Sequence, residues 1–120
     1  MEKTMDLNAL VAEFAENVAA QTDAIWRGDP TTGNKHAKRS IAAFQKLRTV
    51  GDVGREALCA LLVHERPDVR AAAAAVLLRY RTTEALEVLR AIAGGAGLVP
   101  LQASEAIRRW QDGTWALDLA

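Results

Sequence analysis

The chain contains few of the residues that cross-link small proteins or interrupt their helices. Its 120 residues include one cysteine and three prolines, so an internal disulfide framework is excluded. Because Cys59 lies among Leu58, Leu61 and Leu62, we interpret it as a buried apolar thiol and not as a nucleophile. Aromatic residues make up only 5%, and the β-branched runs that are typical of strands are nearly absent. The fold class predicted by these absences is all-α.

A dominant charge of one sign is also missing. The 15 Lys and Arg residues balance 15 Asp and Glu residues, so no overall field attracts nucleic acid or an anionic membrane. No apolar run approaches the roughly 20 residues of a membrane-spanning helix. Residues 1–6 lack the basic and apolar blocks of a signal peptide. These absences predict a cytoplasmic protein that has no membrane partner.

The most informative segment is His-Glu-Arg-Pro-Asp-Val-Arg at residues 64–70, which an alanine run at 71–75 follows. Pro67 suits the first turn of a helix because its missing N–H would be unpaired there. Asp68 places a carboxylate near the positive end of the helix dipole. Apolar stripes on both sides of the segment predict a helical hairpin with a tight turn: Leu58, Leu61 and Leu62 before it, and Val69, Ala72, Ala73, Val76, Leu77 and Tyr80 after it.

Helical spacing of apolar residues predicts about six helices. The first runs over 7–27, with Asp6 as its N-cap and Gly28-Asp29-Pro30 as its stop. A turn is expected at 31–34, and a second helix at 34–50 with Ile41, Phe44, Leu47 and Val50 facing inward. Gly51 is the expected C-cap, and Asp52 starts the third helix. The later helices are expected at 67–80, at about 83–92 with Thr82 or Thr83 as the cap, and at 100–111 with Gly113 as the stop.

A repeat emerges when the second half of the chain is shifted by about 30 residues. Matched pairs include Val69 with Val99, Ala73 with Ala103, Leu77 with Ile107, Arg79 with Arg109 and Tyr80 with Trp110. Two hairpins, 52–80 and 83–113, are therefore predicted to stack on a longer first hairpin, 7–50. The predicted architecture is one domain over 1–120, a short right-handed α-solenoid.

The segment that begins at Pro67 resembles the second helix of HEAT-type repeats. The resemblance is carried by residues 67–70 and by Ala72, Ala73 and Leu77, and it extends over 52–113. It implies that Val69, Ala73 and Leu77 are core positions. It also implies that Asp68 and Arg70 form a ladder pair linking neighbouring repeats. The second hairpin departs from this pattern because Pro100 replaces the arginine. The period near 30 is also shorter than the usual 40–47.

The whole chain is also similar to a family of small uncharacterised bacterial proteins. The similarity is carried by Asn34-Lys35, by Gly-x-x-Gly-Arg-x-Ala-Leu at 51–58, by His-x-x-Pro-x-Val-Arg at 64–70, and by Trp110 near Gly113. Many members are encoded beside polymorphic-toxin genes. The resemblance therefore implies an immunity protein that binds and blocks a cognate toxin domain encoded by an adjacent gene.

No catalytic or metal-binding pattern is evident. His36, His64 and Cys59 are not spaced as metal ligands. Glu65 and Asp68 beside His64 could form an acid–base cluster, but a solvated, capped turn is the favoured interpretation. No phosphate-binding loop or dinucleotide fingerprint is present. The sequence therefore predicts no enzyme and no cofactor.

Charge is distributed unevenly along the first hairpin. Residues 1–30 hold two basic and six acidic side chains, whereas 31–50 hold five basic and none acidic: Lys35, Lys38, Arg39, Lys46 and Arg48. In one interpretation Glu13, Glu16 and Asp23 pair with this basic face across the hairpin. In the other, the basic face binds a phosphate backbone or an acidic partner.

The remaining candidates for partner binding come from the solenoid pattern, in which second helices line a concave surface. They are Arg66, Asp68, Arg70, Arg79, Arg108, Arg109 and Trp115. Arg79 and Arg109 should project in parallel, because they occupy equivalent repeat positions. Trp26 and Trp110 are expected in the core or at its edge. Trp115 is expected either to cap the last hairpin or to anchor a partner.

The leading hypothesis is thus a protein-binding module of the immunity type. One alternative is a nucleic-acid-binding module that uses the helix at 34–50, although zero net charge and few aromatics disfavour it. Another is a scaffold subunit that self-associates through Trp115 and Leu117. Whether the chain is a monomer or a dimer stays open at this point.

Overall fold

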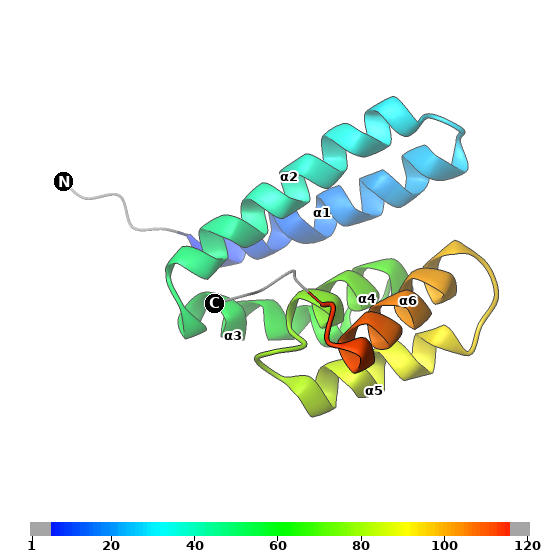
Figure 1. Ribbon diagram of the computed structural model, residues 1–120. Helices are drawn as coiled ribbons and strands as arrows, with labels where there is room; N and C mark the ends of the chain where they lie inside the picture. Colours follow the sequence, from blue (N-terminus) through cyan, green and yellow to red (C-terminus); the bar gives the residue numbers. More distant parts are fainter. Residues whose placement is uncertain (1–5, 116–120) are drawn as a thin grey trace. The chain divides into compact units, whose positions relative to one another are not determined.

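Two long helices begin the fold, and they lie side by side as an antiparallel hairpin (Figure 1). The computed structural model describes residues 6–115. Helix α1 spans Leu7–Trp26, and its N-terminus is capped as predicted, because an Asp6 carboxylate oxygen accepts the Ala9 N–H at 3.1 Å. Helix α2 spans Pro30–Thr49.

The turn between the two helices is shorter than the sequence suggested. Gly28 adopts a φ of 76°, which is open to glycine at little cost. The Asp29 side chain then accepts the Thr32 N–H at 3.2 Å, and Pro30 occupies the start of α2. The predicted turn at 31–34 is therefore wrong, because this cap and the proline start the helix four residues earlier.

The hairpin core consists of large apolar side chains from both helices. They include Leu10, Phe14 and Val18 of α1 and Phe44 and Leu47 of α2. Ile41 and Val50, which were predicted to face inward, are 54% and 38% exposed. The buried face of α2 follows Gly33, Ser40, Ala43, Phe44 and Leu47, and Ile41 lies about 100° from the centre of that face. Val50 lies beyond the helix as its C-cap.

The N-terminal unit ends with a short helix that packs against both α1 and α2. Gly51, with a φ of 72°, closes α2 and leads into α3, Asp52–Leu58. Gly54 passes so close to α2 that an added Cβ would lie 1.9 Å from the Leu47 carbonyl oxygen. The backbones of α2 and α3 can approach this closely only because position 54 has no side chain.

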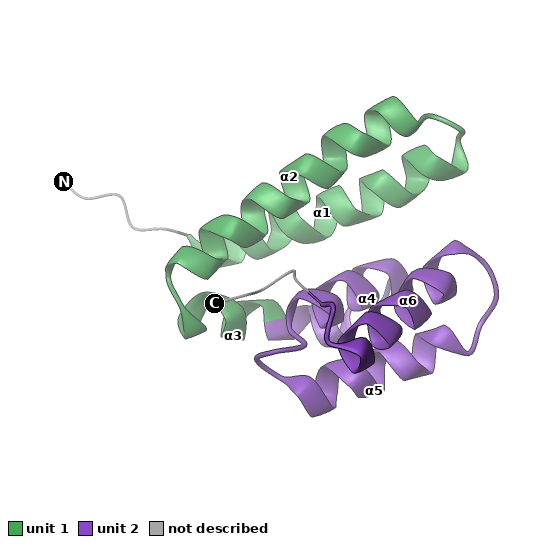
Figure 2. Cartoon of the chain, viewed as in Figure 1, with its two compact units in different colours: residues 1–58 green, residues 59–120 purple. Residues whose placement is uncertain are grey.

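Residues 59–120 form a second compact unit, distinct from residues 1–58 (Figure 2). Its described elements are a 3₁₀ helix, η1, at Cys59–Val63, then α4 at Pro67–Val76, α5 at Thr82–Ala93 and α6 at Leu98–Asp112. Helix α4 packs against η1, α5 and α6. Its alanines allow this close approach, and Ala71, Ala73 and Ala74 are all buried. Ala72, predicted to lie on the apolar stripe, is only half-buried.

The helix predicted to run to Tyr80 ends at Val76. The Leu77 N–H bonds the Ala73 and Ala74 carbonyls, and the Leu77 carbonyl accepts the N–H groups of Tyr80 and Arg81. This turn keeps Leu77 and Leu78 fully buried. Leu77 continues the apolar stripe of α4, whereas Leu78 lies off that stripe and is buried by the turn.

The predicted all-helical class is confirmed: residues 6–115 contain six α-helices and no strand. Pro67 begins α4, and Gly113, with a φ of 75°, closes α6 as predicted. Helix α6 begins two residues earlier than expected. Neither threonine caps α5, because Arg81 is its N-cap residue and Thr82 is its first helical residue. None of the helices within 6–115 has the length and apolar character needed to cross a membrane.

Candidate functional site

Charged side chains in the turn before α4 bond to each other and to the start of that helix. Nε and Nη2 of Arg66 donate to the two carboxylate oxygens of Asp68, both at 3.0 Å. Asp68 also accepts the Val69 N–H at 2.9 Å and is only 8% exposed. This bidentate pair holds the first turn of α4. It engages two of the residues predicted to bind a partner.

Arg70 and His64 close the same turn from its other side. Nη1 of Arg70 donates to the carbonyl oxygens of His64 and Glu65, at 2.7 and 3.1 Å. Nδ1 of His64 accepts the Arg66 N–H at 3.0 Å. The Asp68–Arg70 ladder pair implied by the HEAT resemblance is therefore wrong here, because Asp68 pairs with Arg66 while Arg70 bonds carbonyl groups of its own turn.

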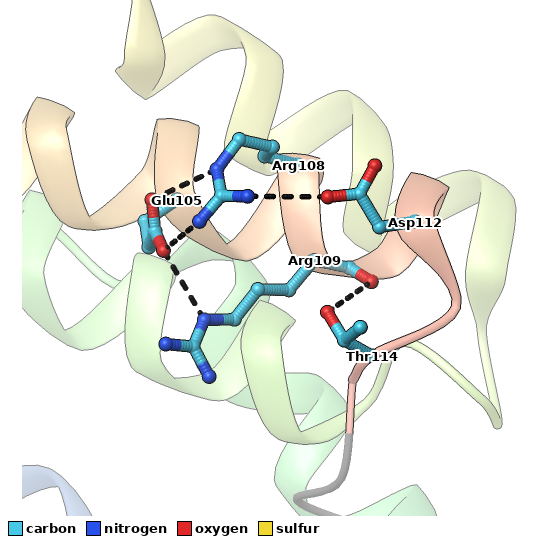
Figure 3. A network of polar contacts seen from close by, with 5 residues as sticks. All are labelled: Glu105, Arg108, Arg109, Asp112 and Thr114. Carbon is cyan, nitrogen blue, oxygen red and sulfur yellow. Dashed lines mark hydrogen bonds and ion pairs between the residues drawn. The ribbon is translucent and has the colours of Figure 1, made fainter.

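Helix α6 carries a network of exposed charges (Figure 3). Arg108 donates to both carboxylate oxygens of Glu105 and, at 3.1 Å, to Asp112. Nε of Arg109 donates to Glu105 at 3.2 Å. Hydrogen bonds from Arg108 and then Arg109 lower the pKa of Glu105, and Glu105 in turn raises the pKa of Arg108. Arg108 is thus held between two carboxylates of its own helix.

Arg79 and Arg109 do not occupy equivalent positions in the structure. Arg79 is exposed in the turn after α4, whereas Arg109 lies within α6. The predicted parallel projection fails because α4 ends before Arg79 is reached. Arg79 nevertheless presents its guanidinium to solvent, and Figure 3 shows the terminal nitrogens of Arg109 beyond its contact with Glu105.

Trp115 lies back against α4 within its own unit. Its indole Nε1 donates to the Ala75 carbonyl at 3.1 Å, and the side chain is half-buried. Ala75 lies in the last turn of α4, where carbonyl groups lack a helical donor. The indole therefore caps α4. Leu117, the second residue of the predicted self-association site, lies outside the described residues.

The tryptophan that sequence reasoning misplaced is Trp26. Predicted to lie in the core or at its edge, it is 75% exposed, whereas Trp110 is half-buried. Trp26 lies off the buried stripe of Leu10, Phe14 and Val18, and α1 ends at this residue. That offset from the apolar spacing was the signal in the sequence.

Trp26 belongs to the hairpin tip, residues 25–31, where α1 meets α2. Ile25 is 40% exposed beside it, and Arg27 is also exposed. The one acidic residue of the tip, Asp29, is used as the cap of α2. Hydrogen bonds from Thr32 lower the pKa of this carboxyl, with smaller contributions from the charges of Arg27 and Lys35. The tip therefore presents an apolar anchor and a cation on a firmly capped turn.

The basic stripe, defined as Lys35, Lys38, Arg39 and Lys46, lies along the exposed side of α2. The helical period places these four residues on one face. Arg48, predicted with them, lies on another face, is half-buried, and donates to Gln45 at 3.4 Å. One polar contact between α1 and α2 is that of 2.9 Å between His36 Nδ1 and Asn17 Oδ1.

Glu13 and Glu16 of α1 are exposed. Among residues 6–115, no ion pair joins either of them to the basic stripe. The predicted pairing across the hairpin is therefore wrong for these two glutamates. The described part of the chain also contains no group of three or more His, Cys, Asp and Glu side chains that could hold a metal ion.

Comparison with known proteins gives a structural likeness and no family. No protein-family model and no curated protein matches the chain. A solved structure that resembles it is the crystal structure of the protein RPA1889 from Rhodopseudomonas palustris, with a TM-score of 0.87 and 25% sequence identity. The alignment covers 94% of each chain. This likeness supports the helical fold and assigns no activity.

Proposed function

We propose that the protein is a protein-binding module, of the immunity type, that occupies and blocks a site on a cognate toxin domain. The observation that carries the proposal is the hairpin tip, where Trp26 is 75% exposed beside Ile25 and Arg27. Tryptophan and arginine are enriched among the residues that dominate binding energy at protein interfaces. A large indole left in water is therefore the best candidate anchor in the chain.

The tip is also ordered before any partner arrives. The Asp29 carboxylate caps α2, and the Gly28 N–H and Asp29 N–H bond the carbonyls of Ile25 and Ala24, at 3.0 and 2.9 Å. A preorganised turn loses little conformational entropy on binding. Enzyme active sites are concave, and a two-helix tip is a suitable shape to enter one. Blocking by occupation needs no cofactor.

The immunity role itself rests on the resemblance to small bacterial proteins encoded beside toxin genes. It is tested by co-expressing the tagged protein with the product of each neighbouring open reading frame and measuring the affinity of any purified pair. We expect a stoichiometric complex and protection of cells that produce the toxin. A pair that does not associate, together with a toxin that kills cells containing this protein, overturns the proposal.

The anchor is tested with Trp26→Ala, which should weaken the complex by at least about tenfold, as expected for a truncated hot spot. Val63→Ala is the matched control, because Val63 is 86% exposed and lies in η1, outside the tip. That variant should bind as the wild-type protein does. Equal losses for both variants contradict a specific role of the tip.

A second candidate function is nucleic-acid binding through the basic stripe. The observation that favours it is four exposed cations on one face of α2. Such binding would weaken steeply with salt, because neutralised phosphates release counterions. A fluorescent duplex and a single strand, titrated at several salt concentrations, test it. Affinity that does not depend on salt excludes this candidate.

A further inference from the structure

We propose that the protein self-associates, with the exposed face of α1 in one copy lying on the basic stripe of α2 in a second copy. The acidic face is defined as Glu13 and Glu16 together with Ala9 and Ala12, all exposed on α1. This contact does not use the hairpin tip, so it goes beyond the proposed function.

The spacing of the charges supports this pairing. Glu13 and Glu16 are three residues apart, and so are Lys35 and Lys38. Three helical residues rise by about 4.5 Å in either helix. A parallel arrangement of the two helices therefore places Glu13 beside Lys35 and Glu16 beside Lys38 at once. Arg39, next to Lys38 on the same face, supplies a further donor.

The shape of both faces permits close approach. Ala9 and Ala12 lie among the glutamates, and Ala42 lies between Arg39 and Lys46 on the basic stripe, all three exposed. Small residues at a contact allow two helices to pack at the short end of the usual 8–10 Å range. The protein as a whole has a formal net charge of zero, so copies do not repel one another.

The acidic face thus complements the charge of the basic stripe, but the two faces do not pair within one copy. Glu13 and Glu16 form no ion pair with the stripe inside residues 6–115. Each copy would use α1 toward one neighbour and α2 toward the next, so the contact is heterologous and builds rings or open chains. Exposed ion pairs are individually weak, and the assembly should therefore be reversible and sensitive to salt.

Analytical ultracentrifugation of the full chain, from micromolar to millimolar concentration, gives the first test. At low salt the weight-average mass should rise with concentration, and at high salt it should return to that of the monomer, because salt screens exposed charges. A monomer at every concentration in low salt overturns the proposal. Association that high salt strengthens overturns it too, because it would indicate an apolar contact.

Charge reversal gives the sharper test. The double variant Lys35→Glu/Lys38→Glu and the double variant Glu13→Lys/Glu16→Lys should each stay monomeric, since like charges then face each other. A mixture of the two should associate again, because the acidic α1 of the first meets the basic α2 of the second, and the acidic α2 of the first meets the basic α1 of the second. Arg79→Glu/Arg90→Glu is the control, as both arginines are exposed in the other unit, and it should associate like the wild type.

Circular dichroism shows whether each variant is folded, and the changed residues are all exposed. Two outcomes contradict the proposed contact: double variants that associate as well as the wild type, and a mixture that stays monomeric. If the protein is monomeric in the absence of DNA and binds a DNA duplex through the basic stripe, the stripe is assigned to nucleic acid instead.

Discussion

The two units use their charged residues in opposite ways. In residues 6–58 the basic stripe stands exposed on α2, and it contains three of the lysines of the chain. Residues 59–120 contain no lysine, and several of their arginines are bonded within their own turn or helix, as in the Arg66–Asp68 pair. Arginine suits such fixed, bidentate contacts because its guanidinium is planar. One unit thus presents an open charged face, whereas the other uses its arginines to hold its own turn and helix.

Packing differs between the units as well. The N-terminal unit packs large side chains such as Phe14 and Phe44 and depends on one very close backbone approach, at Gly54. The C-terminal unit surrounds an alanine-rich helix, α4, whose ends are held by polar side chains. Substitutions should therefore damage the two units at different kinds of position.

The largest effect is expected for Gly54→Ala. The new Cβ would lie 1.9 Å from the Leu47 carbonyl oxygen, and that oxygen belongs to backbone that cannot swing aside. We expect a loss of at least about 3 kcal/mol in the free energy of unfolding, the upper end of overpacking costs. Urea denaturation followed by circular dichroism measures it.

Gly33→Ala is the matched control for this prediction. A Cβ at position 33 would meet its nearest atoms at 3.6 Å, an ordinary contact distance, and Gly33 is helical. The variant should be neutral or gain up to about 1 kcal/mol, because alanine favours helix over glycine. If both variants lose stability equally, the close approach at Gly54 is not what limits the N-terminal unit.

The next largest loss of stability is expected when the buried carboxylate of an ion pair is removed. Asp68→Ala removes a carboxylate that is 8% exposed and bonded to both Arg66 and the Val69 N–H. Because the Arg66 side chain is 38% exposed, the expected loss is moderate, about 2 kcal/mol. Thermal and urea unfolding of the variant give the value.

Glu105→Ala tests the opposite case within the same unit. It removes a carboxylate that contacts two arginines on the surface of α6, yet we expect unfolding indistinguishable from that of the wild type, because exposed pairs contribute little. A larger loss for Glu105→Ala than for Asp68→Ala would show that the number of ion pairs, and not their burial, decides stability here.

Much of the fold followed from patterns with a local cause. The Asp6 cap and the start of α4 at Pro67 depend on residues next to each other in the chain, and both were predicted. The end of α4 depends on how other segments pack against it, and the exposure of Trp26 follows from its offset from the apolar stripe of α1; both were predicted wrongly. For the candidate site, residue types were suggestive, but the bonds of Arg66 and Arg70 depend on turn geometry that spacing alone does not define.

A smaller effect should distinguish two tryptophans, one in each unit. Trp115→Phe removes the indole donor to the Ala75 carbonyl and keeps most of the apolar ring, so a loss of about 1 kcal/mol is expected. Trp26→Phe should leave stability unchanged, since Trp26 is 75% exposed. Differential scanning calorimetry checks both. Equal stability of the two variants would mean that the indole cap contributes nothing.

The smallest effect concerns pH and the hairpin tip. Hydrogen bonds from Thr32 lower the pKa of Asp29 below its ordinary value of 3.8. A group with a lowered pKa in the folded state stabilises above its unfolded pKa, and this contribution is lost as pH falls through the folded pKa. Asp29→Asn should therefore be less stable than the wild type near neutral pH.

The difference between Asp29→Asn and the wild type should shrink as the solution is acidified below about pH 4. Melting temperatures from neutral to acidic pH measure it, with Glu87→Gln, an exposed glutamate of α5, as the control that should follow the wild-type curve. A difference that stays constant with pH would exclude the carboxylate charge as the cause.

The indole of Trp115 has a consequence for how the protein is made. Its acceptor, Ala75, precedes it by 40 residues, and a ribosome delivers the chain from its N-terminus. While α5 and α6 are being synthesised, the Ala75 carbonyl in the last turn of α4 therefore lacks this donor. A nascent chain can contain every helical residue of the C-terminal unit and still have an open helix end. The end closes only when a residue three positions beyond α6 leaves the ribosome.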